Sequence, residues 1–112
     1  MSYRGETVLW LAQRASAAVL ALCVVVHLAT IIYAVQDGLT AAEILARTRG
    51  NAAWLAFYAV FVLALTIHAP IGLRAICIEW LHWRGRSRDL VLLGVAALLA
   101  WMGMRSVFAV FA

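Results

Sequence analysis

Hydrophobic residues fill three long stretches of the chain, and short polar joints separate these stretches. Residues 15–35 and residues 50–73 carry no charged side chain at all. A helix of about 20 apolar residues spans the hydrocarbon core of a bilayer, so each stretch is long enough to cross it. The pattern therefore predicts an all-α membrane protein. Its three transmembrane helices are expected at about residues 8–35, 52–78 and 90–111.

The polar joints predict how the helices end. Residues 36–38, with the sequence Gln-Asp-Gly, end the first transmembrane helix. Thr40 follows, and Glu43 stands three residues after it, which is the spacing of a capping box at a helix start. We therefore expect a short helix over about residues 40–48, lying at the membrane surface. The Gly-Asn pair at 50–51 then breaks the chain before the second transmembrane helix.

Composition supports one membrane domain over residues 1–112. Hydrophobic residues make up 67% of the chain and charged residues 12%, whereas soluble domains are nearer half apolar and a quarter charged. The first apolar stretch is longer than the 7–15 residue core of a cleaved signal peptide. No polar segment is long enough to form a catalytic core. We therefore expect that any demanding chemistry is supplied by a cofactor or by partner subunits.

The charged residues predict the orientation in the membrane. All nine basic residues are arginine, and they gather at the joints, so the net charge of +4 indicates topology and not nucleic-acid binding. One side carries Arg4, Arg14, Arg74, Arg84, Arg86 and Arg88. The other side carries Arg47, Arg49 and Arg105, partly offset by Asp37 and Glu43. The positive-inside rule places the N-terminus in the cytoplasm and the C-terminus outside.

Two histidines lie inside the apolar stretches, His27 in the first and His68 in the second. An ionisable side chain in a bilayer is costly, so it usually marks a functional site. At about 1.5 Å per residue, His68 is about 9 Å from Arg74, and His27 is about 20 Å from Arg14. The two rings are therefore expected at different depths, poorly placed to hold one iron from opposite faces. Each is better matched by a histidine of a neighbouring chain.

Haem is the cofactor that this pattern favours, because two histidines commonly hold an electron-transfer haem between helices. Zinc needs four ligands, and no second ligand is spaced near either histidine. Gly72, one turn after His68, leaves room for a flat macrocycle. Near the start of the first helix, Arg14 and Ser16 are candidates for binding a propionate or a quinone head. Alternatively, an intramembrane histidine only hydrogen-bonds a neighbouring helix.

The segment 68–80, HAPIGLRAICIEW, resembles the second span of the cytochrome b membrane anchors of succinate dehydrogenase and fumarate reductase. These anchors carry a histidine, a glycine four residues on, an arginine two further, and an acidic residue eleven after the histidine. The matching residues here are His68, Gly72, Arg74 and Glu79. The segment 13–28 resembles the first span of the family, whose start reads Arg-x-Ser followed by a small residue.

The resemblance implies a haem- and quinone-binding anchor in a bacterial inner membrane, bound to an iron–sulfur subunit and a flavoprotein subunit. His68 is implied to be an axial ligand of haem b, with His27 the ligand of a second haem, as in two-haem members. Arg14 and Arg74 are implied to hold haem propionates. The quinone site at the cytoplasmic end is implied to include Arg14, Ser16, Glu79 and Trp80. A second anchor chain, or a second copy, would complete a six-helix bundle.

The predicted function is therefore electron transfer between an iron–sulfur subunit and membrane quinone, as part of a succinate:quinone oxidoreductase-type complex. The first alternative is a b-type cytochrome that serves another flavoprotein. A small dimeric proton-coupled transporter is a second, but it needs a carboxylate deep in a span, and Glu79 lies at a span's edge. A third alternative is a purely structural assembly protein, in which neither histidine would have a functional role. The sequence leaves open the direction of electron flow, the quinone type, the acid substrate and the haem count.

Overall fold

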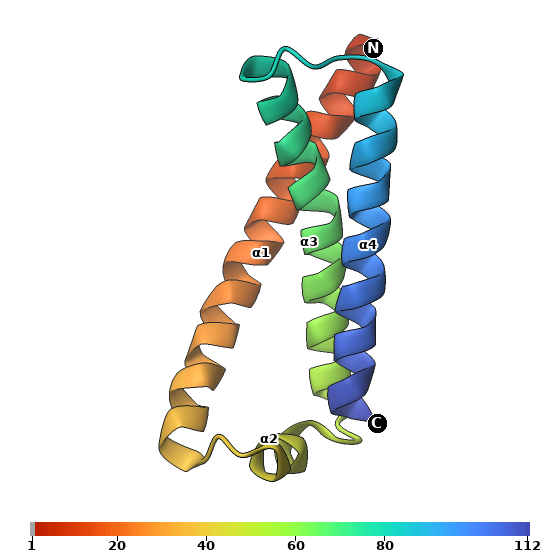
Figure 1. Ribbon diagram of the computed structural model, residues 1–112. Helices are drawn as coiled ribbons and strands as arrows, with labels where there is room; N and C mark the ends of the chain where they lie inside the picture. The colour runs from red at the N-terminus through yellow and green to blue at the C-terminus, as the bar shows by residue number, and fades with distance from the viewer. Residues whose placement is uncertain (1) are drawn as a thin grey trace.

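The computed structural model describes residues 2–112 and contains four α-helices (Figure 1). They are α1 (Tyr3–Asp37), α2 (Ala41–Thr48), α3 (Ala52–Glu79) and α4 (Arg86–Phe111). Helices α1, α3 and α4 are long and apolar enough to cross a membrane. The prediction of an all-α chain with three candidate membrane spans is confirmed. Both α1 and α4 begin several residues before the predicted spans, because their first turns are polar and the prediction counted only apolar residues.

Side-chain caps explain where the helices start. The hydroxyl of Ser2 accepts a hydrogen bond from the Gly5 amide at 3.2 Å, so α1 begins in the polar N-terminal segment. The capping box expected at Thr40 and Glu43 is present, with bonds in both directions. Asn51 caps α3, because its side-chain oxygen accepts hydrogen bonds from the backbone amides of Ala53 and Trp54. Local sequence therefore fixes where α1, α2 and α3 begin.

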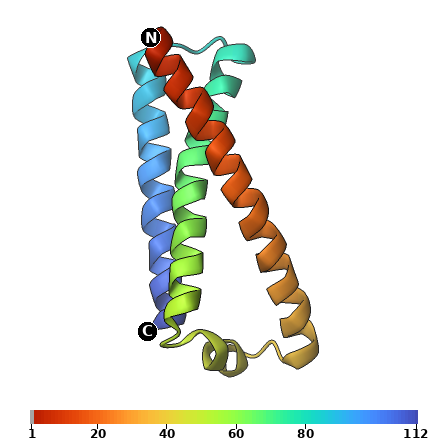
Figure 2. The same ribbon diagram turned by 180° about the vertical axis from the view of Figure 1, so that it is seen from behind.

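Helix α3 is the central element, since it packs against both α1 and α4 (Figures 1 and 2). The N-terminus and the α3–α4 loop lie at one end of the molecule, which we call the N-terminal end. Helix α2 and the C-terminus lie at the other end, which we call the α2 end. Between these ends, α1 crosses α3 near the N-terminal end and diverges from it toward the α2 end.

The packing of α3 on α4 is close. A Cβ atom added to Gly103 of α4 would lie 2.6 Å from Cγ1 of Val62 on α3, so only a residue without a side chain fits there. Small residues at such positions let two helices approach closely within a membrane. Pro70 lies inside α3, and the helix continues through it to Glu79.

Two residues in the last turn of α2 fasten this helix to α4 and α1. The Thr48 hydroxyl donates to the carbonyl of Val110 at 2.8 Å, and this satisfies a carbonyl in the last turn of α4 that has no partner within the helix. On the other side, the guanidinium of Arg47 lies 2.9 Å from the carboxylate of Asp37, the last residue of α1. Helix α2 therefore bridges the widening gap between α1 and α4.

Most of the apolar surface of the three long helices is not covered by the chain itself. In the most hydrophobic 18-residue window of each helix, only 6%, 6% and 11% of the residues are buried. So large an exposed apolar surface would be unstable in water, whereas lipid tails or partner helices cover it without cost. The chain is an integral membrane protein with three candidate spans.

Candidate functional site

His68 lies where α3 crosses α1, and its nearest polar neighbour belongs to α1. Its Nδ1 atom is 3.4 Å from the hydroxyl oxygen of Ser16, a long hydrogen bond. Ser16 is only 5% exposed, which is unusual for a polar residue in this chain. Its hydroxyl also donates to the backbone carbonyl of Gln13 at 3.1 Å. The contact that joins the two helices is therefore polar and sits at the level of the predicted haem ligand.

Gly72, one turn after His68, faces the same part of α1. A Cβ atom added to Gly72 would lie 3.3 Å from the side-chain amide nitrogen of Gln13, tighter than an ordinary contact. The amide oxygen of Gln13 is buried and has no hydrogen-bond partner in residues 2–112. We call Gln13, Ser16, His68 and Gly72 the inner cluster. The sequence prediction missed Gln13, although its position three residues before Ser16 places both on one helix face.

The two arginines predicted to hold propionates have other partners within this chain. Arg74 forms a salt bridge with Glu6, with 3.1 Å between Nη2 and Oε1. Arg14 lies over the ring of Trp10, one turn before it, with 5.0 Å from the guanidinium carbon to the ring centroid. Both residues lie at the N-terminal end, within two turns of the inner cluster. Among residues 2–112, no hydrogen bond joins either arginine to His68.

Glu79 and Trp80 lie at the end of α3, two turns beyond Gly72, and both side chains are exposed. Trp80 is 76% exposed, and in the described part of the chain neither side chain forms a hydrogen bond or an ion pair. Of the residues predicted for the quinone site, Ser16 thus lies within hydrogen-bonding distance of His68. The other three, Arg14, Glu79 and Trp80, are exposed on the surface of the N-terminal end.

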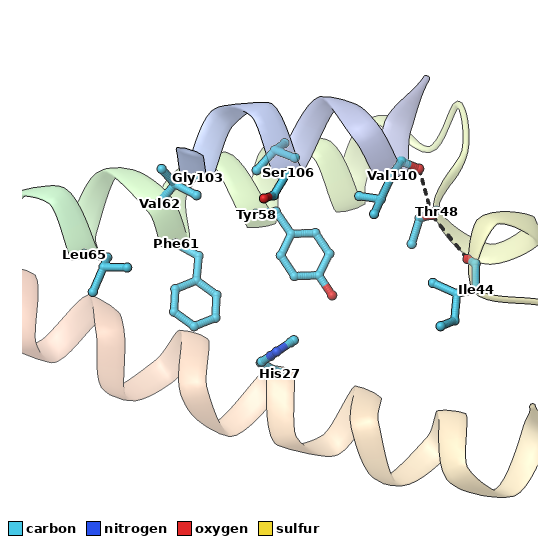
Figure 3. Close-up of a pocket in the computed structure, with 11 residues that line it drawn as sticks. His27, Ile44, Thr48, Tyr58, Phe61, Val62, Leu65, Gly103, Ser106 and Val110 are labelled. Carbon is cyan, nitrogen blue, oxygen red and sulfur yellow. Dashed lines mark hydrogen bonds between the residues drawn. The ribbon is translucent and has the colours of Figure 1, made fainter. Parts of the chain in front are cut away.

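His27 lies in a different environment, nearer the α2 end (Figure 3). Tyr58 and Phe61 project from α3 toward its ring and meet it edge-on, with centroid separations of 5.9 Å and 5.6 Å. The Nδ1 atom of His27 is buried, and no hydrogen-bond partner for it exists among residues 2–112. Sequence reasoning missed both aromatic neighbours, because no local pattern shows which residues of α3 face position 27.

A cavity of about 380 Å³ lies beside His27, where α1 diverges from α3 and α4 (Figure 3). All four helices contribute to its lining, which is almost wholly apolar. A second, wider hollow of about 810 Å³ opens between α1, α2 and the start of α3, and it shares His27 and Tyr58 with the first. Helix α2 closes this region through Ile44 and Thr48. We call the two together the outer cavity.

The structure confirms that the two histidines lie at different levels. His68 contacts α1 at Ser16, and His27 comes eleven residues later, about 16 Å further along that helix. Among residues 2–112, no three His, Cys, Asp or Glu side chains come together as a metal site would require. Neither histidine thus belongs to such a cluster in the described part of the chain.

Comparison with known proteins agrees with this geometry. Residues 1–108 match the family model described as the succinate dehydrogenase/fumarate reductase transmembrane subunit. No curated protein matches the chain, and no solved structure does. The family match covers nearly all of the four helices, including the inner cluster and the outer cavity. The chain therefore belongs to the family of succinate dehydrogenase/fumarate reductase transmembrane subunits.

Proposed function

We propose that this transmembrane subunit binds haem b through His68 and carries electrons between an iron–sulfur subunit and membrane quinone. The observation that supports the proposal is the hydrogen bond between His68 and Ser16 inside a candidate membrane span. Metal-binding histidines almost always use their second ring nitrogen in such a bond, which orients the ring. The family commonly binds haem b and quinone and associates with the dehydrogenase or reductase catalytic subunits.

The inner cluster fits one half of a haem site. His68 would hold the iron through one ring nitrogen, and the bound haem would supply a one-electron carrier within the membrane. A second histidine for the iron would have to come from another chain, because His27 lies about 16 Å away along the bundle. We therefore propose a six-helix bundle, formed with a second anchor subunit or a second copy of this chain.

The N-terminal end is the side that we propose faces the cytoplasm and the iron–sulfur subunit. It carries six of the nine arginines, as the positive-inside rule requires for a cytoplasmic surface. Glu79 and Trp80 are exposed at this end and are free to contact a quinone head or a partner subunit. We propose that the quinone site forms here when the iron–sulfur subunit docks, with Arg14 nearby.

His27 fits a second haem less well than His68 fits the first. Its Nδ1 atom has no acceptor in the described chain, so nothing there orients the ring for an iron. Tyr58 and Phe61 also stand edge-on against the ring. The proposal therefore assigns haem ligation to His68, and a haem count decides whether His27 adds a second one.

A reduced-minus-oxidised absorption spectrum of the purified complex, with haem quantified per copy of this chain, tests the proposal. We expect a b-type spectrum in the wild-type complex, and we expect His68→Ala to abolish it. The matched control is His82→Asn in the α3–α4 loop. His82 is exposed and has a φ of 51°, a conformation that asparagine tolerates. A wild-type complex without b-type haem, or a His68→Ala complex with the full signal, contradicts the proposal.

A further inference from the structure

The inner cluster contains a chain of two hydrogen bonds that runs from α3 to the backbone of α1. Ser16 Oγ lies 3.4 Å from Nδ1 of His68 and 3.1 Å from the carbonyl oxygen of Gln13. A serine hydroxyl has one proton to donate and two lone pairs to accept with. A backbone carbonyl can only accept. The proton of Ser16 is therefore used in the bond to Gln13, and its oxygen is left as an acceptor toward His68.

This direction decides which nitrogen of His68 carries the proton. A neutral imidazole has one N–H and one bare nitrogen, and the hydrogen bond at one nitrogen sets the state of the other. With Ser16 as the acceptor, Nδ1 holds the proton and donates it. The lone pair is then on Nε2, which is the nitrogen left free to bind a metal. If Ser16 instead donated to Nδ1, Nε2 would carry the proton and could not ligate iron.

We propose that Ser16 is a positioning residue, which fixes the tautomer and the orientation of His68 so that Nε2 serves as the haem ligand. The proposal rests on the proposed function, in which His68 ligates haem. It gives Ser16 a role different from the direct quinone contact that the family resemblance implies. The only proton of Ser16 is already used in the bond to Gln13, whereas a quinone carbonyl would need a donor.

Gly72 packs against the side chain of Gln13, beside the hydrogen-bond chain. Gly72 lets α1 approach α3 closely, and a Cβ there would press on the Gln13 side chain at 3.3 Å. The bond from His68 to Ser16 is already long, so a small separation of the helices would break it. Gly72→Ala is therefore expected to weaken the same hydrogen bond without touching either partner.

The test measures the midpoint potential of the haem and the haem retained per chain in Ser16→Ala. A hydrogen bond from Nδ1–H raises the basicity of a ligating histidine, which stabilises the ferric state. We therefore expect Ser16→Ala to raise the midpoint potential and to weaken haem binding by about 10- to 100-fold. The electron paramagnetic resonance spectrum of the ferric haem should shift as well. Ser16→Ala removes one hydroxyl in a helix, and alanine favours the helix, so the subunit should still assemble.

Ser106→Ala is the matched control. Ser106 lies in α4 and donates to the carbonyl of Met102 at 2.9 Å, so it makes the same kind of helical back-bond. It lines the outer cavity and is not part of the inner cluster around His68. We expect its haem potential and content to equal those of the wild type. Gly72→Ala should shift the potential in the same direction as Ser16→Ala, which provides a second test should Ser16→Ala fail to assemble.

Two results would overturn the inference while leaving the proposed function intact. One is a Ser16→Ala haem that matches the Ser106→Ala haem in potential, content and resonance spectrum, while His68→Ala still loses its haem. The other is an unchanged haem with impaired quinone reduction, which would return Ser16 to the quinone site. Full haem content in His68→Ala would instead overturn the proposed function, and the inference with it.

Discussion

Glu6 of α1 and Arg74 of α3 form a salt bridge that joins the two helices at the N-terminal end, with 3.1 Å between Oε1 and Nη2. The carboxylate side chain is 52% exposed and the arginine side chain 18% exposed. Pairs of this kind contribute only about 0–1 kcal/mol, because water and salt screen the attraction. The pair therefore orients Arg74 more than it stabilises the fold.

The salt bridge gives a prediction that distinguishes two roles of Arg74, which are pairing with Glu6 and holding a haem propionate. If the guanidinium serves mainly Glu6, then Arg74→Gln and Glu6→Gln should each lower the free energy of unfolding by less than about 1 kcal/mol. Both should retain the same amount of haem. Thermal unfolding in detergent and a haem assay measure the two quantities. A loss of haem in Arg74→Gln alone would mean that Arg74 holds a haem propionate, as the family resemblance implies.

The close packing of α3 on α4 gives a second prediction. A Cβ at Gly103 would lie 2.6 Å from Val62, so Gly103→Ala should force the helices apart and destabilise the subunit by about 1–3 kcal/mol. Gly94, on the same helix, has nothing within 4 Å of its Cβ position, and Gly94→Ala is the matched control. Unfolding in a denaturing detergent measures the difference, and adding Val62→Ala to Gly103→Ala should restore part of it. Equal stability of the two alanine variants would contradict the packing.

The local features of this fold could be predicted from the sequence, because local rules set them. The three apolar stretches exceed the thickness of a bilayer, and the Thr40 to Glu43 spacing is that of a capping box, so both were predictable from spacing alone. The difference in depth between His27 and His68 followed from the rise of a helix, and the structure confirms it.

The contacts between helices could not be predicted in the same way. Sequence places Ser16 and His68 near one end of the membrane, but only the crossing of α1 over α3 brings them together. The divergence of α1 toward the α2 end, which creates the outer cavity beside His27, depends on packing with no periodic signature. Glu6 was likewise not predicted as the partner of Arg74, because 68 residues separate them in the sequence.

The capping box of α2 gives a third prediction. Hydrogen bonds from the backbone amide and the hydroxyl of Thr40 lower the pKa of Glu43 below its ordinary value of 4.5. Since the pKa is lowered in the folded state, the ionised carboxylate stabilises α2 above about pH 4.5. That stabilisation is lost as the pH falls through the lowered pKa of the folded state. The start of α2 should therefore fray in acid.

Carbon-13 chemical shifts of the Glu43 carboxylate, followed against pH in micelles, measure this pKa directly. Thr40→Ala should raise the pKa of Glu43 toward 4.5 and weaken the start of α2 by about 1 kcal/mol, the usual value of an N-cap. Thr40→Ser keeps both hydrogen-bonding groups and should leave the pKa low. The same pKa in Thr40→Ala and Thr40→Ser would mean that the backbone amide alone lowers it.

The outer cavity gives a prediction about His27. A buried nitrogen without a partner costs about 1–3 kcal/mol, and leucine is apolar and similar in size. His27→Leu should therefore leave the subunit as stable as the wild type or more stable. Because the proposed haem ligand is His68, the variant should also keep the haem content of the wild type. Thermal unfolding and haem quantified per copy of this chain measure both.

His68→Leu is the matched variant at the other level of the bundle, and it should lose the haem. The contrast follows from the two environments, since His68 has a hydrogen-bond partner that orients it and His27 has aromatic edges instead. If His27→Leu instead halves the haem content, then His27 ligates a second haem in the outer half of the membrane. In that case the outer cavity opens further in the assembled bundle, because the edge-on rings of Tyr58 and Phe61 would have to move aside for a macrocycle.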